Sequence, residues 1–163
     1  MTFEVKIGDL FEDVAEGFIM HGCNAQGVMG SGFAKIIRER YPIAYQQYAD
    51  QAPNYILGEV IPVLVAPNLV IVNAITQDFY GTDRVHVDYG AVGQACQGVK
   101  HLARSGMIES DKITFPFIGA GLAGGDQGQL LNIFEAQFAP EWFDNGMNPE
   151  NQDATMYVLE KPL

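Results

Sequence analysis

The chain has 163 residues, of which 48% are hydrophobic and 18% are charged, and its formal net charge at pH 7 is −11. This length and composition are typical of one globular domain with its own core, so we expect residues 1–163 to form a single domain. The negative charge argues against binding to nucleic-acid backbones or anionic membranes, both of which require a basic face. An acidic surface that keeps the protein soluble is the simplest interpretation of this charge.

The cysteines and the hydropathy of the chain indicate the cellular compartment in which we expect the protein. Cys23 and Cys96 do not have the spacing of metal ligands, and such a pair is typical of buried thiols in a reducing cytosol. No apolar run approaches the ~20 residues of a membrane span. The first residues, MTFEVK, lack the charged-then-apolar layout of a signal peptide. We therefore expect a cytoplasmic protein, and we expect it to act as a monomer.

The first part of the chain predicts two strands followed by two helices. Residues 3–7 alternate between apolar and polar, which indicates a half-buried strand, and residues 18–21 form a short apolar run typical of a central strand. Residues 34–41 place apolar side chains on one helical face until Pro42 interrupts the pattern. A second short helix is expected to end near residue 51.

The middle of the chain predicts a hairpin, a loop and a long helix. Residues 60–65 and 69–75 are β-branched runs joined by a short turn, and Pro62 marks the first run as an edge strand. The polar residues 77–87 are expected to form a loop. Asp88 is a plausible N-cap for the apolar-periodic helix that follows it.

The last part predicts a strand at residues 112–117, a helix at residues 130–138 and a strand at residues 154–159. Residues 144–153 are polar and short enough to be a connecting loop. Strand–helix–strand units combined with one hairpin imply a mixed sheet with helices on both faces. The fold class that we expect is therefore α/β, a three-layer α/β/α domain with a mixed central sheet.

Two glycine-rich segments follow predicted strands and precede predicted helices. They are residues 24–35 (NAQGVMGSGFAK) and residues 118–126 (IGAGLAGGD). Such a turn exposes backbone N–H groups at the positive end of a helix dipole, which is an arrangement that binds phosphate. Two of them could hold the two phosphates of a diphosphate, although glycines often serve only turns and close packing. The glycines of the first segment do not follow the spacing of a Rossmann fingerprint, and the chain has no Gly-Lys-Ser/Thr element, which excludes a P-loop.

Several single residues near these loops allow two interpretations. His21 is either a core histidine or a general acid beside a phosphate site. Asp126 is either the N-cap of the helix that follows it or a general base that orients water. Asp9 is a turn residue by default, Asn24 either caps its loop or contacts a sugar hydroxyl, and Tyr157 is either core packing or an aromatic that stacks on a base.

Together these segments resemble the macro domain family, which binds ADP-ribose, and the resemblance covers essentially the whole chain. The segments that carry it are Gly8-Asp9-Leu10, His21-Gly22-Cys23-Asn24, residues 29–34 (MGSGFA), residues 116–122 (PFIGAGL) and Tyr157. The Ile75-Thr76-Gln77 strand end and the Tyr80-Gly81 loop are similar to one branch of that family. This branch contains the ADP-ribose 1″-phosphate phosphatases and related small ADP-ribosyl hydrolases. The resemblance implies the macro domain fold.

The resemblance also implies a place for each part of an ADP-ribose ligand. Asp9, with Leu10 beside it, would accept a hydrogen bond from the adenine amino group, and Tyr157 would stack near the adenine ring. The loop residues Gly30, Ser31 and Gly32 would approach the distal ribose and the first phosphate. The diphosphate would be wrapped by Gly119, Ala120, Gly121 and Leu122. Asn24 would contact the distal ribose.

Catalysis by a histidine and an aspartate is implied by the same branch. Asp126 would activate a water molecule and His21 would assist the leaving group, with neither a metal nor a cofactor. One departure concerns Gln77, since relatives that release ADP-ribose from glutamate side chains carry lysine there, and an amide cannot form the adduct that an amine forms. The extended segment 123–125 also shifts Asp126 relative to those relatives.

Three functions compete on this basis. The leading hypothesis is hydrolysis of ADP-ribose 1″-phosphate to ADP-ribose and phosphate. A second enzymatic hypothesis is removal of ADP-ribose from a protein, nucleic-acid or O-acetyl conjugate. The third is a non-catalytic protein that binds ADP-ribose or another NAD-derived signal.

Overall fold

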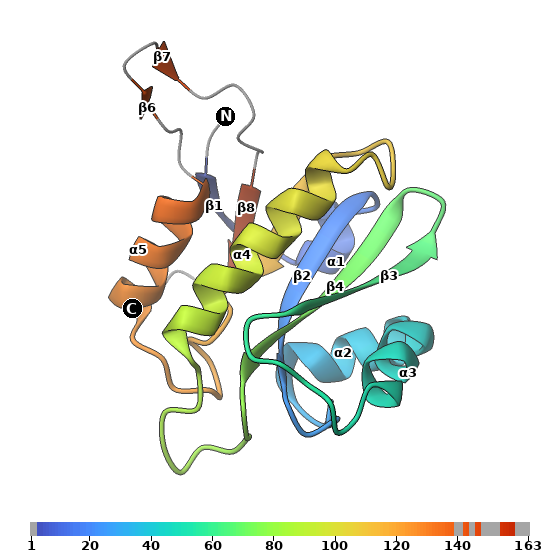
Figure 1. Cartoon of the computed structure of the whole chain (residues 1–163), viewed down its shortest axis with the longest axis vertical. Coiled ribbons are helices and arrows are strands. Elements are labelled where there is room, and N and C mark those ends of the chain that lie inside the picture. Colours follow the sequence, from blue (N-terminus) through green and yellow to red (C-terminus); the bar gives the residue numbers. More distant parts are fainter. Residues whose placement is uncertain (1–2, 139–141, 144–145, 148–153, 159–163) are drawn as a thin grey trace.

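The computed structural model describes residues 3–138, 142–143, 146–147 and 154–158 (Figure 1). Its elements in chain order are β1 (Phe3–Ile7), α1 (Leu10–Asp13), β2 (Gly17–Asn24), α2 (Gly32–Arg40), α3 (Pro42–Asp50), β3 (Val60–Ala66), β4 (Leu69–Gln77), α4 (Tyr89–Arg104), β5 (Ile113–Pro116), α5 (Gln127–Phe138), β6 (Trp142–Phe143), β7 (Gly146–Met147) and β8 (Ala154–Val158). The main sheet has six strands in the order β1-β8-β5-β2-β4-β3.

The sheet is mixed, as the sequence predicts. β1, β8, β5, β2 and β4 run parallel to one another, whereas β3 pairs with β4 in the antiparallel direction. The hairpin predicted from residues 60–75 is therefore confirmed. The prediction that Pro62 lies on an edge strand is also confirmed, since β3 ends the sheet.

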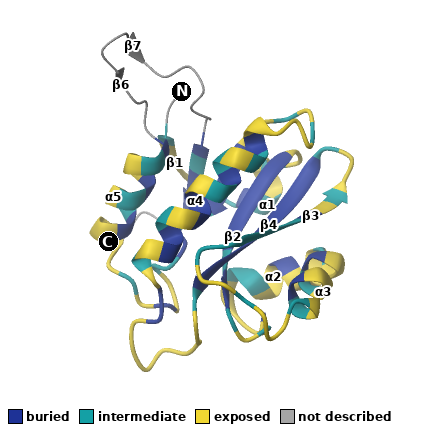
Figure 2. Cartoon of the chain, viewed as in Figure 1, coloured by how far each residue is buried: buried dark blue, intermediate teal, exposed yellow. Residues whose placement is uncertain are grey.

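Helices cover both faces of the sheet and complete three layers (Figure 1). On one face α4 and α5 pack against alternate strand residues such as Phe18, Met20 and Phe115. On the other face Leu10 of α1, Ile37 of α2 and Ala44 of α3 pack in a second apolar cluster. Because both faces are covered, β2 and β4 are buried along almost their whole length, as the dark blue strands in Figure 2 show. This explains their continuous apolar sequence.

Local sequence signals account for where the helices begin. Asp88 is the N-cap of α4, and its Oδ1 accepts a hydrogen bond of 2.9 Å from the Ala91 N–H, which confirms the predicted cap. Pro42 occupies the first turn of α3, where its missing N–H costs no hydrogen bond. In the part of the chain that the structure describes, no helix combines the length and the apolarity needed to cross a membrane.

Two features were not predicted from the sequence. Asp9 does not simply form a turn, because it caps the short helix α1 through a 2.9 Å hydrogen bond from the Phe11 N–H to Oδ1. The strands β6 and β7 form a small antiparallel pair, and β7 lies within the segment 144–153 that was predicted to be a connecting loop. The remainder of that segment lies outside the described residues.

Candidate functional site

Two adjoining cavities open at the carboxyl ends of the parallel strands, where ligands of open α/β sheets commonly bind. The first cavity has a volume of about 650 Å³ and the second about 640 Å³. Phe33, Pro116, Phe117 and Gly121 line both cavities, so the two form one continuous cleft. Each volume lies within the range of small-molecule sites in proteins.

Asn24 shapes the first glycine loop, which follows β2. Its Oδ1 accepts hydrogen bonds from the N–H groups of Gln26 and Val28 at 3.0 and 3.3 Å, and its Nδ2 donates to the Val28 carbonyl at 2.8 Å. The Tyr48 hydroxyl lies 2.6 Å from the Asn24 carbonyl oxygen. The loop-capping interpretation of Asn24 is therefore confirmed. The side chain also lines the first cavity, and a contact with the distal ribose stays a prediction.

The first glycine loop leads into the N-terminus of α2 at the wall of the first cavity. Gly30, Ser31 and Gly32 all line this cavity. Ser31 occupies the N-cap position, but its side chain makes no capping hydrogen bond. The first N–H groups of a helix have no acceptor within the helix, and the helix dipole places partial positive charge there. The N-terminus of α2 therefore has the arrangement that the sequence predicts for phosphate binding.

The second glycine loop follows β5 and is folded tightly by its own backbone. Gly119 has φ +84°, and a Cβ atom there would lie 2.7 Å from Cγ2 of Val87, so only glycine fits. Its carbonyl accepts a hydrogen bond of 2.7 Å from the Gly125 N–H. The N–H groups of Gly119, Gly121 and Leu122 donate to no acceptor among the described residues, and these residues line the first cavity. The loop thus keeps backbone donors for a ligand.

No described residue lining the first cavity has a carboxylate, imidazole, ammonium or guanidinium side chain. Neutral polar groups and backbone N–H groups must therefore provide the polar interactions there. Their partial charges do not depend on the net charge of −11, so an anion could bind locally to a strongly acidic protein. Cys23 lines this cavity as well, and burial raises the pKa of its thiol.

The second cavity brings together the residues that the resemblance assigns to adenine. Asp9, Leu10 and Tyr157 line it, and Ala120 of the second glycine loop contributes to its wall. Tyr157 is only 8% exposed, and burial together with the Asp13 carboxylate raises the pKa of its phenol.

Aromatic rings from two helices line the same cavity. The rings of Phe11 and Phe33 stack with centroids 4.8 Å apart, and the guanidinium of Arg40 lies 4.9 Å from the centre of the Phe11 ring. Both phenylalanines and Arg40 line the second cavity. An aromatic wall with one carboxylate at its edge suits a flat ring that carries a hydrogen-bond donor. The sequence did not single out Phe11 or the stacking role of Phe33.

His21 lies beneath the cleft in the core and lines neither cavity. Its side chain is fully buried, and Nε2 lies 2.6 Å from Oδ1 of Asn73. Because Nδ2 of Asn73 donates to the carbonyls of Ala44 and Ile61, Oδ1 is the acceptor and His21 donates from Nε2. Burial lowers the pKa of His21 to about 4, against the opposing effect of the Asn73 hydrogen bond. These contacts match the interpretation of His21 as a buried core histidine. Its assistance to a leaving group stays a prediction.

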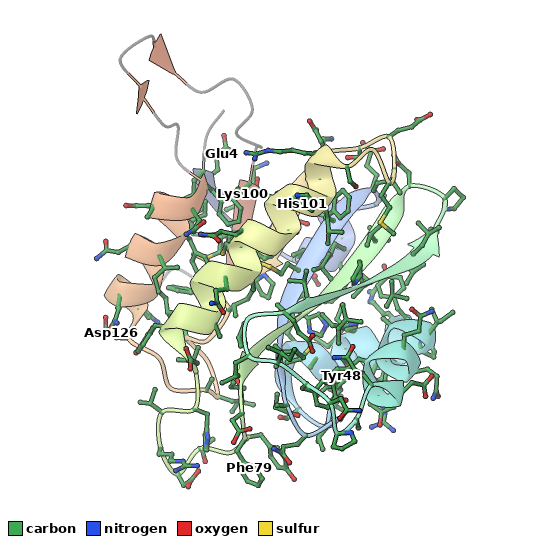
Figure 3. All side chains as sticks on the ribbon, viewed as in Figure 1. Glu4, Tyr48, Phe79, Lys100, His101 and Asp126 are labelled. Carbon is green, nitrogen blue, oxygen red and sulfur yellow. The ribbon has the colours of Figure 1, made fainter. Side chains whose placement is uncertain are left out.

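Asp126 lies at the N-terminus of α5, as Figure 3 shows, and is exposed. Its Oδ1 accepts a hydrogen bond of 2.8 Å from the Gln129 N–H, and its own N–H donates to the Tyr89 hydroxyl at 3.0 Å. The capping interpretation is therefore confirmed. Asp126 lines neither cavity, so the structure does not bring it together with His21 around one point of the cleft. Its role as a general base stays a prediction.

Thr76 and Gln77, at the end of β4, also line the first cavity. The resemblance included them without assigning either a role in binding. Gln77 donates from Nε2 to the Phe79 carbonyl at 2.7 Å, so part of its amide holds the following loop. Among the described residues, no group of three or more His, Cys, Asp or Glu side chains could hold a metal ion.

Comparisons with known proteins agree with this architecture, although no family model matches the chain. A Candida albicans protein named ADP-ribose 1″-phosphate phosphatase is 30% identical over 132 residues, which cover 72% of this chain and 81% of that protein. Proteins of the same name from Ajellomyces capsulatus and Chaetomium globosum are 37% and 33% identical over 49 and 72 residues. These two matches cover 30% and 42% of this chain but only 19% and 38% of the relatives.

Solved structures show the same fold. The macrodomain of Mycobacterium tuberculosis DarG superposes with a TM-score of 0.77 at 19% identity, covering 96% of this chain and 97% of that one. Thermosipho africanus DarTG in complex with ADP-ribose gives a TM-score of 0.71 at 16% identity and covers 99% of this chain and 43% of that one. The sheet order, the three layers and the cleft between two glycine loops define an α/β/α domain of the macrodomain type. The chain belongs to the macro domain family.

Proposed function

We propose that this protein is a hydrolase that binds ADP-ribose and that dephosphorylates ADP-ribose 1″-phosphate. The observation that carries the proposal is the continuous cleft, which joins an aromatic cavity containing Asp9 to a cavity walled by two glycine loops. The aromatic second cavity suits a nucleobase, and the first cavity, between the glycine loops, suits a diphosphate. The Candida albicans relative carries the name of this activity, and the Thermosipho africanus neighbour was solved with ADP-ribose.

The residues of the two cavities support one direction for the bound ligand. Adenine lies in the second cavity beside Asp9 and Tyr157, and the diphosphate crosses the shared wall toward the glycine loops. The distal ribose then lies in the first cavity, near the ends of β2 and β4. The N–H groups at the start of α2 and in the second glycine loop bind the phosphate oxygens.

Hydrolysis transfers the terminal phosphoryl group to water and leaves the hydroxyl of ADP-ribose. Backbone N–H groups that face the negative oxygens stabilise charge in the transition state and need no protonation change. The resemblance to the phosphatase branch implies that Asp126 activates the water and that His21 assists the leaving group. For Asp126 this role requires the carboxylate to leave the Gln129 N–H and turn toward the first cavity.

A second candidate function is a non-catalytic protein that binds ADP-ribose. The observation that favours it is the first cavity itself, because its described lining residues have no carboxylate or imidazole to act as general acid or base. Release of ADP-ribose from conjugates is the third candidate. The relatives that release ADP-ribose from glutamate side chains depend on the amine of a lysine, and this chain has Gln77 at that position. Release of ADP-ribose by this protein would therefore need a reaction in which water is the nucleophile.

One experiment separates these candidates. Phosphate release from ADP-ribose 1″-phosphate and ADP-ribose binding by calorimetry are measured on the same sample. We expect both binding and turnover. Binding without turnover would favour the non-catalytic candidate or another ADP-ribose conjugate, and absence of ADP-ribose binding would contradict the proposal as a whole.

A further inference from the structure

We infer that Thr76 is a ligand-binding residue that recognises the end of the ligand farthest from adenine, through a hydrogen bond between its hydroxyl group and an oxygen of the distal ribose. The inference rests on the proposed function for the identity of the ligand. It adds a specificity-determining side chain to a cavity otherwise dominated by backbone donors. Three observations on this residue carry it.

The first observation is that the Thr76 hydroxyl is buried without a partner. Thr76 is 1% exposed, and Oγ1 makes no hydrogen bond with any described residue. A buried hydroxyl in this state loses its hydrogen bonds with water and gains nothing in return, so such groups are rare in stable folds. Thr76 also lines the first cavity, so a bound ligand can supply the missing partner.

The second observation is that the neighbouring strand has no side chain where it passes this hydroxyl. Gly22 on β2 lines the same cavity, and a Cβ atom there would lie 2.8 Å from Oγ1 of Thr76 and 3.0 Å from Cγ2 of Ile118. Gly22 does not have positive φ, so its backbone conformation does not require glycine. The close approach to Thr76 is therefore the physical reason for glycine at this position, and any larger residue would cover the hydroxyl.

The third observation is the place of Thr76 in the sheet. Tyr157 of the second cavity lies on β8, and the sheet order from there is β8-β5-β2-β4. Three strand spacings of 4.7–4.9 Å separate β8 from β4, a distance of roughly 14 Å. With adenine beside Tyr157, a ligand that follows the strand ends reaches Thr76 with its distal ribose. A threonine hydroxyl can both donate to a ribose oxygen and accept from a ribose hydroxyl.

The neighbouring polar side chains are already engaged in the fold. The Asn24 amide bonds the backbone of Gln26 and Val28, and the Gln77 amide bonds the Phe79 carbonyl. Thr76 differs from both because its Oγ1 makes no hydrogen bond to any residue that the structure describes. Thr114, on β5, has the only other buried side-chain oxygen or nitrogen atom without a partner among the described residues, and it lines neither cavity.

Thr114 therefore provides a matched control for the experiment. Thr76→Val and Thr114→Val each replace a buried, unpartnered hydroxyl by a methyl group of similar size, so neither is expected to lower the thermal stability. Binding of ADP-ribose and of ADP, which lacks the distal ribose, is measured by calorimetry for wild type and both variants. We expect Thr76→Val to weaken ADP-ribose binding about tenfold and to leave ADP binding unchanged. Thr76→Ser, which keeps the hydroxyl, and Thr114→Val should bind both ligands like wild type.

The outcomes are distinguishable from failure of the proposed function. Wild type that binds no ADP-ribose contradicts the proposed function. Wild-type binding with unchanged affinity in Thr76→Val overturns the inference alone. Equal weakening of ADP and ADP-ribose overturns the placement of Thr76 at the distal end. If Thr76→Val does not fold, Thr76→Ala measured against Thr76→Ser gives the same comparison of a variant without the hydroxyl and one with it.

Discussion

At the scale of single residues, His21 and Asp126 are held by hydrogen bonds within the protein. His21 donates to Asn73 in the core, and Asp126 accepts from the Gln129 N–H at the start of α5. Both side chains are of types used in acid–base catalysis, and both also have ordinary structural roles. The partner that each side chain contacts could not be read from its own position in the sequence. The two roles of each residue can nevertheless be separated by substitution.

For Asp126, the cap and the general base can be tested with two variants. Asparagine is as good an N-cap as aspartate but a poor base, whereas alanine is neither. We expect Asp126→Asn to keep the free energy of unfolding and the ADP-ribose affinity but to lose turnover of ADP-ribose 1″-phosphate, because an amide caps the helix but does not activate water. Asp126→Ala should lower the free energy of unfolding by about 1 kcal/mol. Retained turnover in Asp126→Asn would contradict the role of this carboxylate as the general base and leave it only the role of the cap.

For His21, burial predicts that the protein loses stability in mild acid. Its pKa is lowered to about 4 in the folded state from 6.5, so between these values the unfolded state binds more protons. The free energy of unfolding should therefore fall as pH decreases from 6.5 to 4, by about 3 kcal/mol from this residue alone.

The measurement is urea unfolding across this pH range, with direct titration of the His21 ring by NMR. His21→Gln, which has no titratable group, should show a shallower dependence of stability on pH. A His21 ring that titrates near pH 6.5 in the folded protein would contradict the prediction.

At the scale of elements, two aspartates begin helices in the same way but at different places relative to the cleft. Asp9 caps α1 and lines the second cavity, and Asp88 caps α4 outside both cavities. The Oδ1 atom of Asp9 is used by the cap, and Oδ2 has no hydrogen-bond partner among the described residues. A single carboxylate can thus start the helix and still accept a hydrogen bond from a ligand.

We expect Asp9→Asn to keep the cap but weaken ADP-ribose binding about tenfold, because an amide accepts less strongly than a carboxylate and adds a donor opposite the adenine amino group. Asp88→Asn makes the same chemical change at a cap outside the cleft, so it should leave the affinity unchanged. Calorimetry and thermal unfolding on the same samples provide the comparison. Unchanged affinity in Asp9→Asn would show that adenine does not bind beside Asp9.

At the scale of the whole molecule, an acidic protein is proposed to bind an acidic ligand. The net charge of −11 repels ADP-ribose at long range, whereas the described residues around the first cavity have no charged side chain and offer backbone N–H groups. Long-range repulsion slows encounter, and local dipoles determine the interactions once the ligand is bound. Salt acts mainly on the first of these effects, because it screens charges that lie beyond about 10 Å at 0.1 M.

We therefore expect the association rate of ADP-ribose to rise a few-fold between about 20 and 150 mM ionic strength, as the repulsion is screened. Stopped-flow measurements would check this, with uncharged adenosine as a control whose association rate should not change. A rate that falls with salt would show that a local positive field, and not the overall negative charge, guides the ligand.

The order of strands and helices, the hairpin and the two glycine loops could be predicted because each depends on local pattern. The apolar runs of β2 and β4 indicate strands buried on both faces, and the glycine loops follow strands in a way that is typical of phosphate binding. Asp88 could be identified as an N-cap because it immediately precedes an apolar-periodic helix. The resemblance then placed Asp9, Leu10 and Tyr157 around one ligand group, and the structure brings all three to one cavity.

The tertiary structure alone decided which side chains meet. Asn73 is the register partner of His21 on β4, 52 residues away, so their hydrogen bond depends on strand pairing that no local pattern specifies. The same pairing of β2 with β4 places Gly22 against Thr76, whose hydroxyl has no hydrogen-bond partner in the described part of the chain. Local sequence determines helices, strands and turns because these depend on nearby residues. Contacts across the sheet depend on strand order and register, which only the packing of the whole chain establishes.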